Sequence, residues 1–149
     1  RTCLSAFDNA LFMAGIANYN LLMLSSVIPS KSRVTVCQAD RNDLEYGNKL
    51  YIVLSRKDEE TIGCVACAGL GWIQRKDGSG LFVEHIGDSK EQVIDLIKFS
   101  LEDMASYRED GYGKINYRVN SVKCVGKPVC SVVAAVYQSE GWNTTGGKK

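Results

Sequence analysis

The stretch Asn20-Leu21-Leu22-Met23-Leu24-Ser25-Ser26-Val27-Ile28-Pro29 decides how the chain is interpreted, because its apolar run ends in two serines just before a proline. The run predicts a buried strand over residues 20–27. The serine pair has two interpretations. Small hydroxyl residues are common at strand ends, where they satisfy free backbone groups. Alternatively, Ser25-Ser26 is a site at which the chain cuts itself.

Self-cleavage would require serine at position 26, because its oxygen acts first as nucleophile and then as leaving group. The hydroxyl attacks the carbonyl carbon of Ser25 and converts the peptide bond to an ester. β-Elimination of the ester frees Ser25 as a new carboxyl terminus and leaves dehydroalanine at position 26. Hydrolysis of the dehydroalanine, which adds water and releases ammonia, then turns residue 26 into a pyruvoyl group, a ketone at a new N-terminus.

The sequence around the serine pair favours self-cleavage. Its blocks, in order, are Leu4-Ser5-Ala6-Phe7-Asp8-Asn9-Ala10-Leu11, Ala14-Gly15-Ile16, Asn18-Tyr19-Asn20-Leu21 and Ser25-Ser26-Val27-Ile28-Pro29. This order resembles the pyruvoyl-dependent arginine decarboxylase family. A later block, Leu81-Phe82-Val83-Glu84-His85-Ile86-Gly87, is similar to the family's segment around its catalytic glutamate. The resemblance covers nearly the whole chain, although Ser30-Lys31-Ser32 replaces a more proline-rich connection.

The resemblance implies a carbon-carbon lyase of polyamine biosynthesis that converts L-arginine to agmatine and CO2 through a Schiff base with the pyruvoyl group. That covalent group, derived from Ser26, would replace pyridoxal phosphate, and no metal is expected. Two alternatives remain: the same scaffold acting on another amino acid, and an unprocessed, non-catalytic scaffold subunit. The resemblance also implies a homotrimer with active sites between neighbouring subunits.

The resemblance assigns roles to individual residues as well. Ser26, Glu84 and Asn20 would be catalytic, with Ser25-Ser26 as the cleavage site and Asn20 supporting the self-cleavage. Asp8, Leu11 and Ser25 would bind the substrate, since the carboxylate of Asp8 can form a bidentate pair with a guanidinium. Without the resemblance, Asp8 is explained by the dipole of the helix in which it lies.

Strand alternation places Glu84 on one face with Phe82 and Ile86, and His85 on the other. A glutamate on an apolar face has its charged form disfavoured, so we predict a raised pKa and a role as proton donor. The alternative is a glutamate on a solvated edge strand. His85 is predicted to be a surface or second-layer residue.

The composition describes an ordinary globular domain of 149 residues with 45% hydrophobic content and a net charge of +1. Neither a basic nor an acidic block occurs, which argues against nucleic acid and membrane surfaces as partners. No apolar run reaches the roughly 18 residues that span a bilayer. We therefore expect a cytoplasmic protein.

Six cysteines raise the question of disulfides or zinc. Cys64 and Cys67 have CxxC spacing, but no second pair exists and His85 is the only histidine. Residues three apart on a strand point to opposite faces, so one metal could not easily bind both. Buried, reduced thiols are the simpler expectation, above all for Cys37, Cys64, Cys67 and Cys130, which have apolar neighbours in the sequence.

The remaining pattern predicts an α+β domain over residues 1–140 with a flexible tail over 141–149. With the resemblance, the expected fold is a four-layer αββα sandwich with mixed, largely antiparallel sheets. Self-cleavage would divide the domain into a short β chain and a longer α chain. The predicted helices cover residues 5–14, with Ser5 and Asp8 as a capping box, and 90–110; further strands are predicted at 33–38, 49–56, 81–86, 113–123 and 129–137. The apolar stretch over residues 61–73 is rich in small residues, which would let another layer approach closely.

Overall fold

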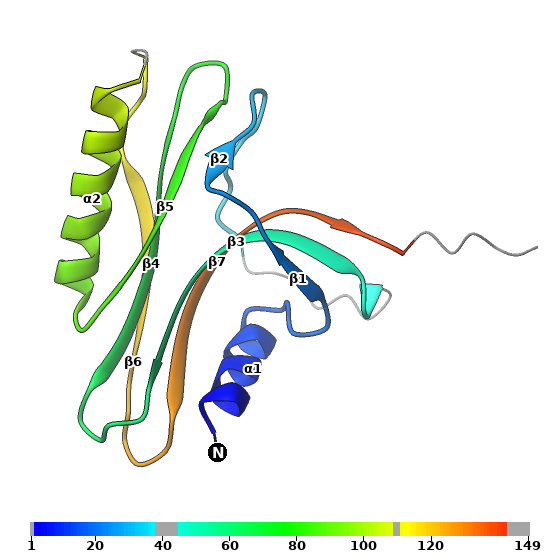
Figure 1. Ribbon diagram of the computed structural model, residues 1–149, viewed down its shortest axis with the longest axis vertical. Coiled ribbons are helices and arrows are strands. Elements are labelled where there is room, and N and C mark those ends of the chain that lie inside the picture. Colours follow the sequence, from blue (N-terminus) through cyan, green and yellow to red (C-terminus); the bar gives the residue numbers. More distant parts are fainter. Residues whose placement is uncertain (1, 38–44, 109–110, 143–149) are drawn as a thin grey trace, which may run out of the picture.

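Two β-sheets packed face to face form the centre of the molecule (Figure 1). The computed structural model describes residues 2–37, 45–108 and 111–142. In that part of the chain the helices are α1 (Cys3–Met13) and α2 (Lys90–Ser106). The strands are β1 (Asn20–Met23), β2 (Val27–Ile28), β3 (Lys49–Glu59), β4 (Val65–Gln74), β5 (Gly80–Gly87), β6 (Asn116–Lys123) and β7 (Val129–Glu140).

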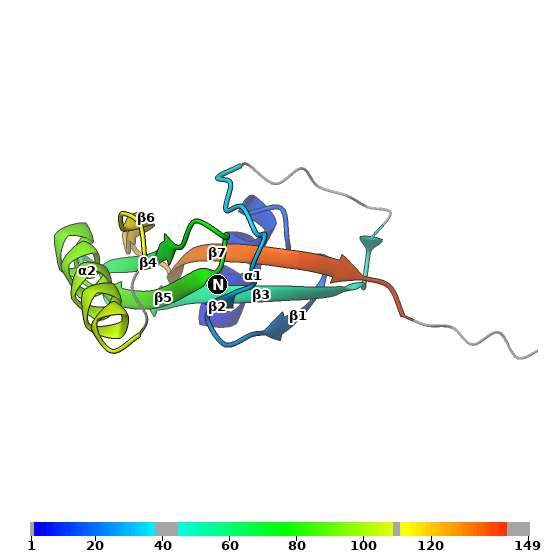
Figure 2. The ribbon, with the colours of Figure 1, turned by 90° about the horizontal axis from the view of Figure 1, so that it is seen from above.

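Each sheet is covered on its outer face by one helix. The first sheet has the order β1-β3-β7, and the second has the order β2-β5-β4-β6. β1 runs parallel to β3, and the other pairings between these strands are antiparallel. α2 packs along β4 and β5, while α1 packs on β7 and β3 (Figures 1 and 2). The layers confirm the predicted α+β, four-layer αββα sandwich.

Three apolar clusters hold these layers together. They lie under α2 (Cys67, Ile73, Leu81, Val83, Val93, Ile97, Leu101), between the sheets (Ile28, Val53, Leu70, Trp72, Phe82) and under α1 (Leu11, Ile16, Leu50, Ile52). A Cβ on Gly71 of β4 would lie 2.1 Å from Cγ2 of Ile97. The small residues of this strand therefore let the helix approach the sheet closely, as predicted.

The segment predicted as one buried strand over residues 20–27 is instead divided between the two sheets. β1 pairs with β3 in the first sheet, and β2 pairs with β5 in the second. The Leu24 N–H still donates to the carbonyl of Ile52, whereas the carbonyl of Ser26 accepts from the Phe82 N–H, both at 2.8 Å. The chain thus changes sheets at Ser25. β1 is an edge strand with mostly exposed side chains, so the prediction of a buried strand was wrong.

The start of α1 also differs from the prediction. Thr2 is the N-cap, and its side chain accepts a hydrogen bond from the Ser5 N–H at 3.1 Å. Ser5 Oγ in turn accepts from the Thr2 N–H at 3.0 Å. The capping box is therefore formed by Thr2 and Ser5, not by Ser5 and Asp8, because the serine at the third helical position can satisfy the N-cap backbone itself.

Several boundaries needed correction further along the chain. Residues 33–37, part of a predicted strand, form no strand, and residue 38 lies outside the described residues. α2 ends at Ser106, before the predicted residue 110, and the side chain of Tyr107 is 65% exposed. Within the tail predicted over residues 141–149, the indole N–H of Trp142 donates to the carbonyl of Gly47 at 2.8 Å. Residues 143–149 lie outside the described part.

Candidate active site

Ser26 and Glu84, 58 positions apart in the sequence, meet where the chain passes from the first sheet to the second. Ser26 Oγ lies 2.8 Å from both carboxylate oxygens of Glu84, to which it donates a hydrogen bond. Both side chains are half-buried. A hydroxyl held on a carboxylate has an acceptor for its proton in place, which is the arrangement that an activated serine nucleophile needs.

The backbone around Ser26 forms a tight turn. The Val27 N–H donates to the carbonyl oxygen of Ser25 at 2.7 Å, which closes a three-residue turn centred on Ser26. The same peptide unit is held from its other side, because the Ser26 carbonyl accepts from the Phe82 N–H of β5. A donor aimed at the Ser25 carbonyl polarises it and would stabilise negative charge on its oxygen if that carbon were attacked.

Strand alternation along β5 is confirmed on both faces. Phe82 belongs to the apolar cluster between the sheets, while the ring of His85 turns the other way. His85 Nε2 lies 2.7 Å from Ser100 Oγ on α2, and burial lowers the pKa of His85. His85 is thus a second-layer residue, as predicted.

Tyr137 is a neighbour of this site that the sequence pattern did not single out. Its hydroxyl donates to the carbonyl of Val27 at 2.9 Å, and its ring packs edge-on against Phe82 with centroids 6.1 Å apart. Burial, with the negative charge of Glu84, raises the pKa of Tyr137. The residue lies in a long apolar strand, where a tyrosine reads as core packing.

A cavity of about 590 Å³ lies beside Tyr137 and Phe82, between the sheets and beneath residues 32–37. Its lining is mostly apolar, and the charged side chains in it are Arg33 and Arg118. Two cations repel a guanidinium, so this cavity does not suit the charged end of arginine.

The other predicted site residues lie away from Ser26 within one subunit. Asn20 lies at the start of β1, six positions before Ser26, and its amide donates to the carbonyl of Gly47 at 2.7 Å. Asp8 lies on the exposed side of α1, which packs on β3 and β7 (Figure 1). Leu11 is buried in the cluster under α1. One subunit therefore brings together Ser25, Ser26 and Glu84, but neither Asp8 nor Asn20.

The cysteines divide by position. Cys67 and Cys124 are buried, whereas Cys37 and Cys64 are exposed, so the prediction that both would pack inside was wrong. All six thiols are free. Within residues 2–37, 45–108 and 111–142, no three histidine, cysteine, aspartate or glutamate side chains form a group that could hold a metal ion. None of the helices described here is long and apolar enough to cross a bilayer.

Comparison with known proteins identifies the family of this chain. The family model for pyruvoyl-dependent arginine decarboxylase matches residues 1–141. The chain belongs to this family. The pyruvoyl-dependent arginine decarboxylase of Thermococcus kodakarensis is 30% identical over 139 residues, which are 91% of this chain and 85% of that protein. The protein of the same description from Halobacterium salinarum is 30% identical over 138 residues, with 91% and 86% covered.

Membership in the pyruvoyl-dependent arginine decarboxylase family makes this chain a decarboxylase, and therefore a carbon-carbon lyase. The family name implies a covalent pyruvoyl group, and the residues present fit it. Ser26 supplies a hydroxyl next to a polarised carbonyl, and Glu84 supplies an acceptor for the hydroxyl proton. Ser26 would hold the group, with the Phe82 N–H directed at the carbonyl oxygen of residue 26.

Proposed function

We propose that this chain converts L-arginine to agmatine and CO2 with a pyruvoyl group that it makes by cutting itself between Ser25 and Ser26. The contact of Ser26 Oγ with both carboxylate oxygens of Glu84 carries the proposal. Family membership supports the class of reaction, and the names of the relatives support arginine as substrate.

For self-cleavage, Glu84 accepts the proton of Ser26 Oγ while this oxygen forms a bond to the carbonyl carbon of Ser25. The peptide nitrogen of Ser26 leaves that carbon and takes up the proton, so an ester and a free amine replace the amide. The Val27 N–H, 2.7 Å from the Ser25 oxygen, stabilises the negative charge of the tetrahedral stage. Elimination then removes the Cα proton of residue 26 and breaks the bond between its Cβ and the ester oxygen.

For decarboxylation, the pyruvoyl ketone supplies the group that reacts with the substrate α-amine and accepts the electrons of the broken carbon-carbon bond. Glu84 stands beside residue 26 and, once protonated, can return a proton to the substrate carbon that has lost CO2. Ser25, as the new carboxyl terminus, lies next to residue 26 and is placed to contact the substrate.

The guanidinium of the substrate needs a carboxylate as its partner. The charged side chains in the cavity between the sheets are the cations Arg33 and Arg118, so the carboxylate must come from elsewhere. We assign this role to Asp8 of a neighbouring subunit, with Leu11 beneath it in α1, and we assign Asn20 to the same subunit-to-subunit site. A homotrimer would bring these residues to Ser26. Exposed apolar side chains support such an interface, for example Met13 at 70%, Met23 at 59% and Val27 at 61%.

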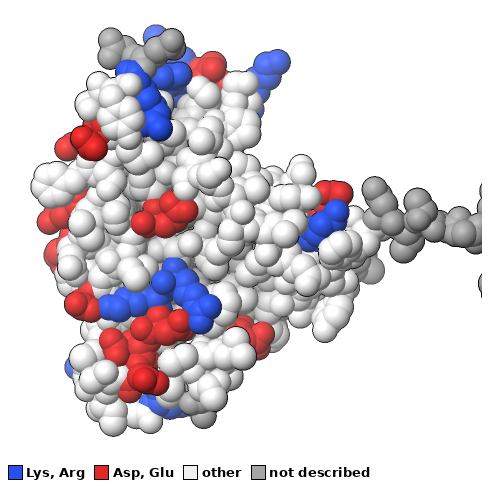
Figure 3. All heavy atoms as spheres, viewed as in Figure 1, with Lys and Arg blue, Asp and Glu red and all other residues white. Residues whose placement is uncertain are grey.

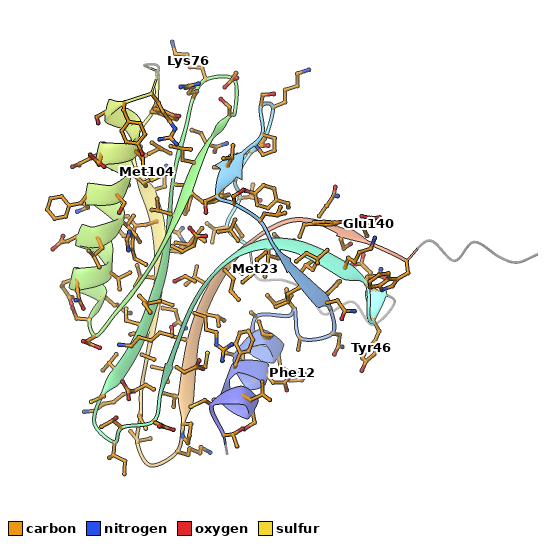
Figure 4. All side chains as sticks on the ribbon, viewed as in Figure 1. Phe12, Met23, Tyr46, Lys76, Met104 and Glu140 are labelled. Carbon is orange, nitrogen blue, oxygen red and sulfur yellow. The ribbon has the colours of Figure 1, made fainter. Side chains whose placement is uncertain are left out.

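The same side of the molecule offers a surface suited to contact between subunits. Phe12 lies on α1 and Met23 on β1 (Figure 4), which belong to the layers of the first sheet, whereas α2 packs on the second sheet. In this view the surface over β1 carries few charged side chains (Figure 3). An uncharged, partly apolar face is typical of stable homo-oligomer interfaces.

Intact mass under denaturing conditions tests the self-cleavage first. We expect two fragments that meet between Ser25 and Ser26, the larger one lighter by one ammonia than a fragment that starts with serine. Ser26→Ala should remain a single chain. A wild-type protein that stays whole, even with hydroxylamine to attack the ester, would be a scaffold and would overturn the proposal.

Release of CO2 from a panel of amino acids then tests the substrate. We expect arginine to be the preferred substrate and agmatine to form without added pyridoxal phosphate. Preference for lysine or ornithine would leave the chemistry in place and overturn arginine as the substrate. We further propose a cytoplasmic location, since six free thiols are typical of a reducing compartment.

A further inference from the structure

Tyr137 makes a hydrogen bond that joins the two sheets at the cleavage site. It lies on β7 of the first sheet, and its hydroxyl donates at 2.9 Å to the carbonyl of Val27, on β2 of the second sheet. β2 has only two residues, which pair with Leu81 and Gly80 of β5. A strand of two residues makes few backbone hydrogen bonds. A hydrogen bond from a side chain of the opposite sheet therefore adds substantially to what holds β2 in place.

This restraint acts on the residue whose N–H faces the scissile carbonyl. The Val27 N–H donates to the Ser25 oxygen, and the carbonyl of the same Val27 is the group that Tyr137 holds. Only the two backbone torsions of Val27 separate these groups. Fixing the carbonyl therefore limits the rotations that would turn the N–H away from Ser25.

The restraint would otherwise be incomplete. Phe82 fixes the peptide unit between Ser26 and Val27 through the Ser26 carbonyl. The side chain of Val27 is 61% exposed and provides little anchoring. Tyr137 thus holds Val27 from the first sheet. Its ring also contacts the ring of Phe82, the residue whose N–H holds the Ser26 carbonyl.

We propose that Tyr137 is a positioning residue for self-cleavage, which aims the Val27 N–H at the Ser25 carbonyl; this rests on the proposed function above. Tyr137 touches neither Ser26 Oγ nor the scissile bond in the proposal, and it acts through Val27. Because burial and Glu84 raise its pKa, the hydroxyl stays protonated and able to donate across the neutral range.

The test follows proenzyme made by brief cell-free synthesis, with intact mass measured over time for the wild type, Tyr137→Phe and Ser131→Ala. Ser131 is a matched control, because its hydroxyl also leaves β7 to donate to a carbonyl of the second sheet, that of Asn120 at 2.9 Å. It lies six residues from Tyr137 along the strand. We expect Tyr137→Phe to cut about tenfold more slowly and Ser131→Ala to cut at the wild-type rate.

Hydroxylamine separates the two halves of the reaction. If Tyr137 positions the carbonyl for attack, the ester forms slowly in Tyr137→Phe, and hydroxylamine does not restore the rate. Restoration by hydroxylamine would place the defect at elimination and overturn the inference. A Tyr137→Phe rate within about twofold of the wild type would overturn it as well, while leaving the proposed function intact. A wild type that never cuts would instead overturn the proposed function.

A second variant keeps the test decisive if Tyr137→Phe folds poorly. Difluorotyrosine placed at position 137 keeps the ring and hydroxyl but ionises at lower pH, and a phenolate cannot donate. We expect its cleavage rate to fall as pH rises through that ionisation, while the wild-type rate does not fall in the same range. A packing role alone predicts the same pH profile for both proteins.

Discussion

The hydroxyl of Ser26 faces both carboxylate oxygens of Glu84. In the proposed self-cleavage, this negatively charged carboxylate accepts the proton of the nucleophile. Glu84→Gln keeps the size of the side chain and removes the charge. We expect this variant to cut itself about 100-fold more slowly or not at all, as is typical when a general base is removed. Intact mass over time measures the rate.

The matched control for this prediction is Glu102→Gln on the exposed side of α2, which should process normally. Both variants should melt close to the wild type. Normal processing of Glu84→Gln would mean that the carboxylate is not the base, and that another group takes the Ser26 proton.

The pairing of Ser26 with Glu84 could be anticipated because each lies in a motif of its own, and strand alternation placed Glu84 with Phe82 and away from His85. Tyr137 could not be anticipated, since its role depends on the approach of two sheets. The backbone N–H groups of Val27 and Phe82 could not be anticipated either, because every residue type except proline has such a donor. The roles of Asp8, Leu11 and Asn20 stay predictions, because they depend on a second subunit.

Among the elements, the contact of α2 with β4 depends on glycine. A Cβ at Gly71 would lie 2.1 Å from Ile97 Cγ2 and 3.2 Å from Leu101 Cδ1. We expect Gly71→Ala to lower the free energy of unfolding by about 1–3 kcal/mol through overpacking, measured by urea denaturation. Gly141→Ala, whose nearest contact would be 3.8 Å away, should have little effect. Equal stability of the two variants would mean that α2 shifts at little cost.

The far ends of β3 and β7 are joined by charge. The carboxylate of Glu140 accepts hydrogen bonds from Lys49 Nζ at 2.8 Å and Tyr51 Oη at 2.7 Å, which lower the pKa of Glu140. A lowered carboxyl pKa stabilises the fold above the ordinary glutamate pKa, and this contribution is lost as pH falls through the folded value.

We therefore expect the wild type to lose thermal stability more steeply on acidification than Glu140→Gln, in low salt. High salt should narrow the difference, because the carboxylate is partly exposed and screened. Melting curves across the acid range measure both effects. Parallel curves would mean that this pair contributes nothing to stability.

Element boundaries show which physical signals a sequence carries. The strand over residues 49–56 was found because a central strand is apolar along its length, although β3 continues to Glu59. The break at Ser25 was missed, because an apolar run does not reveal which sheet each half joins. The capping box was displaced by three residues, since Thr2-Ser5 and Ser5-Asp8 have the same spacing and only the helix itself decides between them.

At the scale of the whole molecule, the proposed trimer makes a prediction about mixed assemblies. Asp8→Ala and Glu84→Gln should each be nearly inactive alone. Co-expressed, they should recover about a quarter of wild-type activity, because a random pairing of neighbours around a closed ring joins an intact Asp8 to an intact Glu84 at that frequency. Agmatine formation measures the recovery.

The control is the same pair of variants expressed separately and mixed only after purification, which should recover less if the trimers exchange slowly. Absence of recovery in co-expressed protein, with mixed trimers verified by native mass spectrometry, would mean that Asp8 does not complete a neighbour's site.

The division of β1 and β2 between the two sheets affects how long the processed protein stays folded. A cut after Ser25 leaves a short piece docked on the first sheet through α1 and β1, without covalent connection to the rest. Refolding of the intact chain is a first-order event, but refolding after the cut requires two molecules to meet and so depends on concentration. The processed protein would therefore keep a fold that its pieces reached as one chain, and its working lifetime would follow the rate at which the short piece escapes.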